Sequence, residues 1–135
     1  MPTKTTGKYF EAVGRRKTAI ARVRLFKDAK NSFEINGKTL EVYFPVREMQ
    51  ITASEALSNS KATENFFASV KLIGGGISAQ AEAMRHGIAR ALLVYDINLR
   101  GGVKKLGYLK RDPRAKERRK FGFKKARKSP QWSKR

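Results

Sequence analysis

The C-terminal segment of the chain carries more positive charge than a small folded domain holds without a counterion. Residues 104–135 contain 15 Lys or Arg and 2 acidic residues, a net charge of +13, whereas residues 1–103 have a net charge of +7. The same segment has few aliphatic side chains, so it cannot bury enough apolar surface to offset the entropy lost on ordering. We therefore expect a globular domain over residues 1–103 and, over residues 104–135, an extended basic tail that becomes ordered on a polyanion.

Composition narrows the classes of function further. The 135 residues have a net charge of +20, no cysteine and a single histidine, His86. A chain this basic is typical of nucleic-acid-binding proteins. Without Cys and with one His, it offers no disulfide framework, no thiolate chemistry and no multi-His metal site. We see no N-terminal secretion signal and no apolar run long enough to span a membrane, so we expect a cytoplasmic protein without membrane contact or cofactor.

The first 103 residues show the pattern of a small α/β unit. Over residues 18–25, small and aliphatic side chains alternate with Ile20, Arg22 and Arg24, which predicts a half-buried strand with a basic outer face. Further strands are predicted over residues 8–13, 32–35 and 65–73. Gly14 interrupts the pattern of the first one.

Apolar residues at three- and four-residue steps predict two helices, one over residues 46–57 and one over residues 77–95 with Ser78 as its N-cap. Gly87 inside the second helix costs about 1 kcal/mol relative to Ala, so we expect it to serve close packing. A sheet of about four strands covered by two main helices follows, an α+β arrangement in two layers.

The residues that could support an enzyme do not form a recognisable site. Gly74-Gly75-Gly76 lies between a predicted strand and a predicted helix, but the residues after it match neither a P-loop nor the dinucleotide-binding pattern. We interpret this loop as a flexible turn that brings the strand and the helix close together, with Gly75 and Gly76 as candidates for contact with an RNA phosphate. His86 lacks a nucleophile and an orienting acid at a defined spacing, and the acidic residues are scattered among cations. We expect no catalytic residue and no metal site.

Two basic features favour RNA as the partner. Arg15, Arg16 and Lys17 begin the strand that carries Arg22 and Arg24, which predicts a stripe for backbone phosphates. The alternative is a solvated charge run that protects a sheet edge. In the tail, the aromatic residues at positions 108, 121, 123 and 132 alternate with cations, a pattern suited to an irregular RNA surface.

Three stretches resemble a known family: GRRKTAIARV at residues 14–23, EVYFP at residues 41–45, and GGGISAQAEAMRHGIARAL at residues 74–92. They are similar to the universal small-subunit ribosomal protein S-nine family in its bacterial or organellar form. The resemblance continues in the tail, at residues 112, 117–120, 124–128 and 133–135.

This resemblance implies a fold of the ribosomal S-five second-domain type, a mixed sheet with two helices and a left-handed crossover. It implies a structural role in the small ribosomal subunit, in the cytoplasm or in an organelle, beside neighbouring head proteins and without homo-oligomerisation. The partner would be small-subunit rRNA in the head, within the 3′ major domain. The end of the tail would contact the tRNA in the P site.

The expected binding residues lie on the basic strand, the glycine loop, the second helix and the tail. For rRNA they are Arg15, Arg16, Lys17, Arg22, Arg24, Gly75, Gly76, Gln80, Arg85, His86, Arg90, Arg111, Arg114, Arg118, Arg119, Lys120, Lys124, Lys125, Arg127 and Lys128; for tRNA they are Ser133, Lys134 and Arg135. Gly101-Gly102 stands where the family usually has Pro-Glu, so we expect no ordered helix there. Trp132 stands where Phe is usual.

Two other classes of protein stay open on the sequence. One is a histone-like protein that compacts DNA with a basic tail. The other is a relative of small-molecule kinases, because the same fold hosts enzymes with glycine-rich phosphate loops, although those enzymes are much longer than 135 residues.

Overall fold

In the computed structural model, which describes residues 7–134, the sheet is built outward from β2 (Ala19–Asp28). β2 pairs antiparallel with β1 (Tyr9–Arg16) on one side and with β5 (Asn65–Ile73) on the other. β3 (Ser32–Ile35) pairs parallel with β5, and β4 (Lys38–Thr39) completes the order β1-β2-β5-β3-β4. The sheet has five strands where about four were expected, because the two residues of β4 are too few to leave an alternating pattern in the sequence.

The predicted faces of β2 are confirmed. Its alternate side chains from Ala19 to Leu25 are buried, while Arg22 and Arg24 lie on the opposite face. The expected interruption of β1 at Gly14 is wrong, because Gly14 pairs with Ala21 within the ladder and the strand continues to Arg16.

A helical crossover joins the parallel strands β3 and β5. It contains the short helix α1 (Leu40–Tyr43) and the longer α2 (Arg47–Asn59). Parallel neighbours require such a connection, since a tight hairpin joins only antiparallel strands. The left-handed sense of this crossover stays a prediction.

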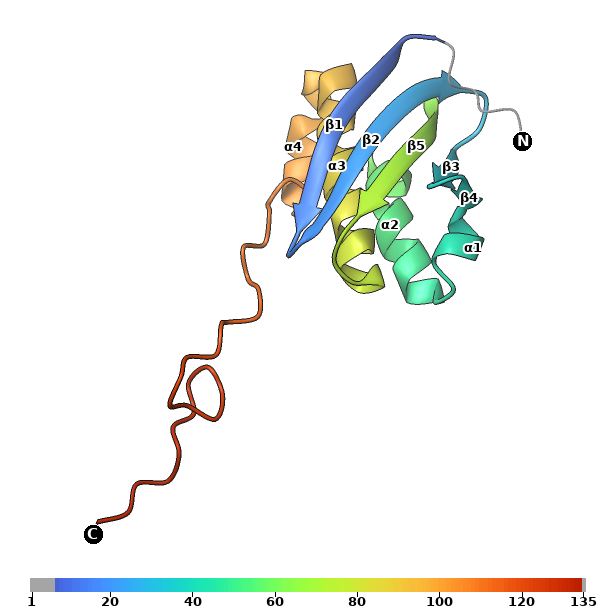
Figure 1. Cartoon of the computed structure of the whole chain (residues 1–135). Coiled ribbons are helices and arrows are strands. Elements are labelled where there is room, and N and C mark those ends of the chain that lie inside the picture. Colours follow the sequence, from blue (N-terminus) through green and yellow to red (C-terminus); the bar gives the residue numbers. More distant parts are fainter. Residues whose placement is uncertain (1–6, 135) are drawn as a thin grey trace.

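Helix α3 (Ile77–Tyr95) lies across β1 and β2, and α2 packs beside it on the same face of the sheet (Figure 1). The expected two-layer α+β arrangement is therefore present. The predicted N-cap at Ser78 is wrong, because Gly76 has the extended backbone of an N-cap and its carbonyl oxygen accepts the first helical hydrogen bond, from the Gln80 N–H at 2.9 Å.

Gly87 has the packing role that its place in a helix predicted. A Cβ at this position would lie 2.7 Å from Val23 Cγ2 on the buried face of β2, far closer than two carbon atoms normally approach. A glycine lets α3 lie directly on the sheet.

After α3 the chain forms the 3₁₀ turn η1 (Ile97–Leu99) and helix α4 (Arg100–Lys105). The expectation that Gly101-Gly102 prevents an ordered helix is therefore wrong. Val103 is buried in the core, and its apolar burial outweighs the helix-breaking tendency of the two glycines. Asp96 also stabilises the start of this region, since its side chain accepts a hydrogen bond from the Asn98 N–H at 2.9 Å.

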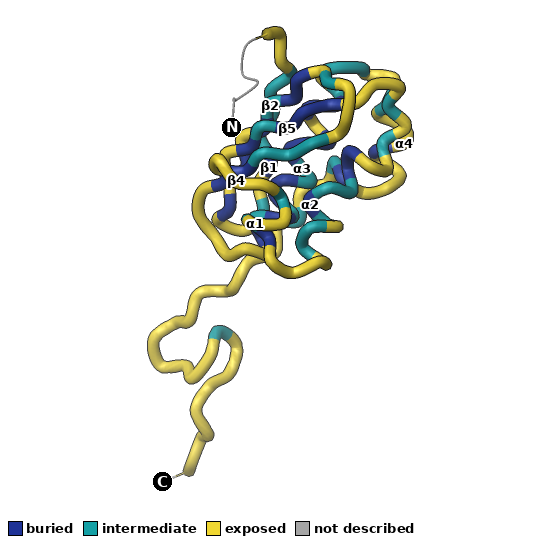
Figure 2. The backbone as a smooth tube through the Cα atoms, turned by 90° about the vertical axis from the view of Figure 1, so that its right-hand side faces the viewer, coloured by how far each residue is buried: buried dark blue, intermediate teal, exposed yellow. Residues whose placement is uncertain are grey.

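The core continues to Tyr108, whose buried ring places its hydroxyl oxygen 3.0 Å from the Asn59 side-chain nitrogen that donates to it. From Lys110 to Lys134 the described chain contains no helix or strand, and almost all of its residues are exposed (Figure 2). Among the helices described here, none combines the length and apolarity needed to cross a membrane.

Candidate nucleic-acid interface

The face of the sheet opposite the helices carries a row of basic side chains. Arg22 pairs across the ladder with Lys71 of β5, and Arg24 pairs with Ser69. Lys71 was not among the predicted binding residues. Alternation within residues 65–73 places it on the polar face, but only the pairing of β2 with β5 sets it beside Arg22.

Glu11 offsets part of this positive charge. Its carboxylate accepts a hydrogen bond from Arg22 Nε and lies 3.7 Å from Arg24 Nε. The bond from Arg22, together with the charges of both arginines, lowers the pKa of Glu11 below its usual value. Glu11 therefore stays ionised and holds the two guanidinium groups in place over the sheet.

A row of aromatic side chains lies next to the basic row, near the start of β1 and the end of β2. The ring centroids of Tyr9 and Phe26 are 5.5 Å apart, and those of Phe26 and Phe67 are 6.1 Å apart. The Arg24 guanidinium lies 4.8 Å from the centre of the Tyr9 ring, a cation–π contact.

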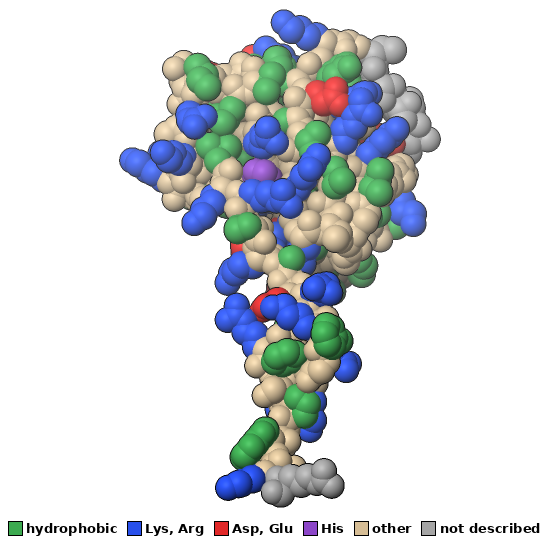
Figure 3. Space-filling view, turned by 60° about the vertical axis from the view of Figure 1, so that its left-hand side comes forward, with side chains coloured by type: hydrophobic (Ala, Val, Ile, Leu, Met, Phe, Trp, Pro, Cys, Tyr) green, Lys and Arg blue, Asp and Glu red, His purple; other side chains and the backbone are tan. Residues whose placement is uncertain are grey.

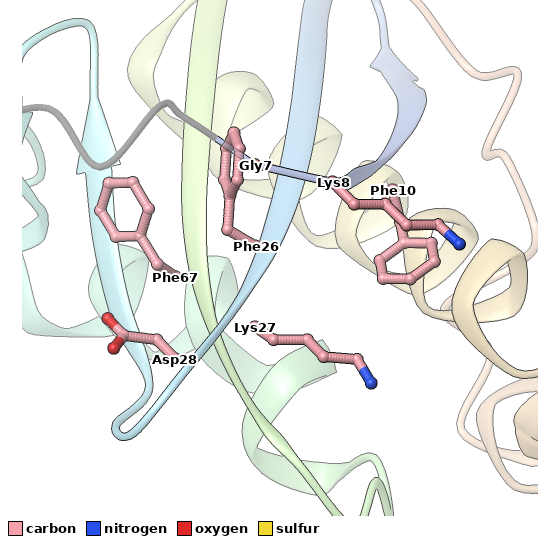
Figure 4. Close-up of a pocket in the computed structure, with 7 residues that line it drawn as sticks. All are labelled: Gly7, Lys8, Phe10, Phe26, Lys27, Asp28 and Phe67. Carbon is pink, nitrogen blue, oxygen red and sulfur yellow. The ribbon is translucent and has the colours of Figure 1, made fainter.

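A cavity of about 500 Å³ opens beside this row. Figure 4 shows its lining of Gly7, Lys8, Phe10, Phe26, Lys27, Asp28 and Phe67. Lys27 forms an ion pair with Glu64 at 2.9 Å.

The turn between β1 and β2 presents Lys17 at the end of the sheet. Arg16 pairs with Ala19, which leaves Lys17 and Thr18 as a tight exposed turn with Lys17 at φ 52°. Short hairpin turns often require positive φ. Arg15 is exposed next to this turn, so two of the predicted cations project from the hairpin end.

The glycine loop packs against the hairpin turn. A Cβ on Gly74 would lie 2.7 Å from the Thr18 carbonyl oxygen, and one on Gly75 would lie 2.9 Å from Ala19 Cβ. Both glycines also have positive φ, 74° and 66°. Their conformation and packing show a turn that lies close against the hairpin, whereas Gly76 has open space beside it.

Both polar atoms of the Gln80 side chain form hydrogen bonds within the protein. Its Nε2 donates to the Gly74 carbonyl oxygen at 3.0 Å, and its Oε1 accepts from the Tyr43 hydroxyl at 2.6 Å. These bonds connect the glycine loop with α1 and α3.

Arg16 joins β1 to residues 109–114, which we call the tail root. Its side chain is 14% exposed, and its Nε donates to Glu82 Oε2 on α3 at 2.6 Å. Its Nη1 donates to the Arg114 carbonyl oxygen, and its Nη2 lies 3.7 Å from Asp112 Oδ2. Hydrogen bonds from Arg114 hold the pKa of Asp112 well below its usual range. Arg16 is therefore the centre of an internal network that fixes the tail root to the globular domain.

His86 is held between β1 and the tail root. Its Nδ1 accepts a hydrogen bond from the Arg15 backbone N–H at 3.2 Å, and the imidazole also hydrogen-bonds the Leu109 backbone. Burial, followed by the charge of Arg90, lowers its pKa below the usual value. His86 is thus neutral at pH 7, as an acceptor at Nδ1 must be.

Two further arginines of α3 bind other groups of the same chain. Arg90 Nη1 donates to the Val13 carbonyl oxygen at 2.6 Å, beside the contact that His86 makes with the same strand. Arg85 forms an ion pair with Glu55 at 3.1 Å, and its guanidinium lies 5.3 Å from the centre of the Tyr108 ring.

The predicted tail residues are exposed, and Figure 3 shows Lys and Arg side chains along the tail and around the histidine on the adjoining surface. They are Arg111, Arg114, Arg118, Arg119, Lys120, Lys124, Lys125, Arg127 and Lys128. Ser133 and Lys134 are also exposed, and Arg135 lies outside the described residues. Within residues 7–134, no group of three or more His, Asp or Glu side chains could hold a metal ion.

Comparison with known proteins identifies the family. A family model described as ribosomal protein S9/S16 matches residues 14–135. A curated relative, the small ribosomal subunit protein uS9 of Lawsonia intracellularis (strain PHE/MN1-00), is 46% identical over 124 residues, which cover 92% of this chain and 95% of the relative. Because the match runs from Gly14 in β1 through α3 to the end of the tail, the chain belongs to the ribosomal protein S9/S16 family.

Proposed function

We propose that this chain, a structural constituent of the small ribosomal subunit, binds the small-subunit rRNA of the head with the hairpin end of its sheet and with its tail. One observation supports this surface above others: Arg16 ties the tail root to β1 and α3. Arg15 and Lys17 therefore sit beside the point where the basic tail leaves the domain. Backbone phosphates are the groups that such a surface recognises.

The predicted residues divide into two roles under this proposal. Exposed cations such as Arg15, Lys17 and Arg22 contact phosphates directly. Arg16 and His86 act through other residues, because their polar atoms already hold the strand and the tail root in position.

We further propose that the end of the tail contacts the tRNA in the P site. Fully extended, residues 129–135, which follow the hydrogen-bonded segment 124–128, span about 25 Å, enough to reach beyond the body of the domain. Pro130 fixes its own φ and favours an extended Ser129, which stiffens the approach. Ser133 and Lys134 are exposed at this end and would bind the tRNA backbone by charge and shape.

The remaining parts of the proposal concern partners and location. We propose contact with neighbouring head proteins, no homo-oligomer, no catalytic activity and residence in the ribosome of the cytoplasm. The match to a small-subunit protein over 95% of its length supports this assignment.

Salt-dependent binding to purified small-subunit rRNA tests the hairpin surface. The double variant Arg15→Ala, Lys17→Ala lowers the slope of log affinity against log salt by about 0.7–0.9 for each phosphate that the protein no longer binds. Arg16 is left intact, because removing it would also release the tail root. The charge-matched control is the double variant Lys30→Ala, Lys38→Ala. Both lysines are exposed; Lys30 follows β2, and Lys38 lies on β4, at the edge of the sheet opposite β1. An unchanged salt slope in the hairpin variant would exclude the hairpin end from the interface.

Sedimentation of the tagged protein from a lysate tests the assignment as a whole. The protein is expected to migrate with small ribosomal subunits. A pool that migrates with DNA instead would favour the DNA-compacting alternative.

A further inference from the structure

Residues 117–128, which we call the tail loop, fold back on themselves although they contain no helix or strand (Figure 1). An ion pair between Arg127 Nε and Glu117 Oε2, 2.8 Å apart, closes the loop. Backbone bonds fix its second half: the Lys124 N–H donates to the Lys128 carbonyl oxygen at 2.8 Å, and the Lys128 N–H donates to the Lys125 carbonyl oxygen at 3.3 Å. The tail thus holds a closed element within an otherwise extended chain.

A tight turn forms the tip of this loop. The Phe123 N–H donates to the Lys120 carbonyl oxygen at 3.3 Å, and Gly122 between them has φ +81°. A glycine with this φ at the third position is typical of a type II turn. Arg119 Nε supports the turn by donating to the Phe123 carbonyl oxygen at 3.0 Å.

The turn directs one aromatic ring into solvent. Phe121 is 99% exposed, so its ring contacts essentially nothing in the protein. Lys120 precedes it directly in the sequence, and Lys124 and Lys125 follow shortly after. After Asp112, Glu117 is the one acidic residue of the tail sequence, and Arg127 already binds it.

We propose that the tail loop is a preformed site for an unpaired RNA base, which stacks on Phe121 while the neighbouring phosphates contact Lys120, Lys124 and Lys125. This inference rests on the proposed RNA-binding function and adds the chemical group that the tail recognises. An aromatic face flanked by cations is the combination with which proteins bind unstacked bases. A paired base inside a helix keeps its faces covered, so the site selects bulges, loops and strand ends.

A protein partner fits the loop less well than RNA does. The centres of protein interfaces are depleted in charged residues, and Lys is depleted across these interfaces. Here three lysines lie within four residues of the exposed ring in the sequence. RNA offers a base to stack on the ring and phosphates to bind the lysines.

Equilibrium binding of the full-length protein to two probes tests the inference. One probe is a short RNA duplex that carries a single unpaired adenosine, and the other is the same duplex fully paired. Phe121→Leu keeps an apolar side chain but removes the aromatic face, so we expect the ratio of bulged to paired affinity to fall about tenfold. Phe121→Trp keeps the aromatic face and is expected to retain the ratio.

Glu117→Gln tests whether closure of the loop contributes to the preference for the bulged RNA. This variant raises the net charge by one, so both affinities increase if charge alone matters. A preformed loop requires the ratio of bulged to paired affinity to fall, because the ion pair to Arg127 is removed. An unchanged ratio would contradict the preformed loop.

The outcomes separate this inference from the function on which it rests. If the wild-type chain binds neither probe, the RNA-binding proposal itself is wrong. If it binds both probes equally, or if Phe121→Leu leaves the ratio unchanged, RNA binding stands and the base-stacking inference is overturned. Loss of a neighbouring head protein from reconstituted subunits without any change in the RNA ratio would assign Phe121 to a protein partner and overturn the inference as well.

Chemical probing of reconstituted small subunits identifies the source of the base. A base in rRNA that becomes reactive with Phe121→Leu in the absence of tRNA assigns the site to rRNA. A base that changes reactivity only when tRNA is bound assigns it to tRNA. No change in either RNA would contradict the inference.

Discussion

Gly14 of β1 and Gly87 of α3 meet backbone to backbone. A Cβ on Gly14 would lie 2.7 Å from Gly87 Cα and even closer to the Gly87 nitrogen and the Ala83 carbonyl oxygen. At each position a side chain would collide with the other element, so only glycine fits there. The close approach also brings His86 and Arg90 within hydrogen-bond distance of the outer edge of β1.

Gly87→Ala is expected to destabilise the protein even though alanine is the better helix former. In an open helix the change would stabilise by about 1 kcal/mol. Here the added methyl meets Val23 Cγ2 at 2.7 Å and the Gly14 nitrogen at 3.1 Å, so we expect a net loss of about 1–3 kcal/mol in the free energy of unfolding. Urea denaturation measures it. Gly101→Ala is the matched control, because nothing lies within 4 Å of its Cβ, and equal losses in both variants would contradict the packing explanation.

Ile88→Ala and His86→Ala separate the two sides of α3. Ile88 is fully buried in the core, so its truncation is expected to cost about 2–5 kcal/mol. His86 is half-buried and makes hydrogen bonds to β1 and the tail root, so its removal is expected to cost about 1 kcal/mol, more than a merely solvated side chain would. Urea denaturation of both variants checks the order, and equal losses would contradict the observed phase of the helix.

The contribution of His86 to the free energy of unfolding is expected to depend on pH. Its pKa is lowered in the folded protein, so below the unfolded value of about 6.5 the unfolded chain binds the proton more readily. Stability is therefore lost as pH falls from about 6.5 toward the lower folded-state pKa, and this loss is absent well above pH 6.5. The stability advantage of wild type over His86→Gln should shrink over this range. A constant difference between pH 7 and the acidic range would exclude His86 as the titrating group.

Arg16→Ala is expected to free the tail root in the absence of RNA. The substitution removes the bonds to Glu82 and Arg114, whereas Arg15→Ala changes the net charge equally and leaves them intact. Because the chain has no cysteine, Ala115→Cys provides a single position for a fluorescent label. Fluorescence anisotropy of this label should fall with Arg16→Ala and not with Arg15→Ala. Unchanged anisotropy in both would show that Arg16 does not hold the tail root.

Deletion of residues 133–135 is expected to leave subunit assembly intact and to weaken P-site tRNA binding modestly and equally for all tRNAs. The removed groups would bind the tRNA backbone, which carries no base identity. The measurement is tRNA affinity for purified mutant small subunits at fixed magnesium and salt. Wild-type affinity and dissociation rate would contradict the tail-to-tRNA contact while leaving the rRNA role untouched.

The sequence predicted those parts of the fold that leave a periodic pattern. Alternation in β2 and helical spacing in α2 and α3 were sufficient, because each element buries one face. It missed β4, which is too short for a pattern, and α4, where the two glycines predicted no ordered helix but burial of Val103 stabilises one.

The candidate interface was less predictable, because it depends on pairings between distant residues. Arg16 looked like one of three equivalent cations, yet Glu82, far along the sequence, binds it and makes it an internal anchor. Lys71 joins Arg22 only through the register of β5 against β2. Charge and spacing can predict that a surface is basic, but the tertiary contacts determine which cations are free to bind.

The coverage of β1 by α3 also bears on the protein before it meets RNA. β1 is an edge strand, and an open edge can recruit a strand from another molecule. The Val13 carbonyl and the Arg15 N–H, which point outward from that edge, are already bonded by Arg90 and His86. At these two positions the backbone of a newly made copy is already hydrogen-bonded within its own chain, so a strand of another molecule would have to displace Arg90 and His86 to pair there.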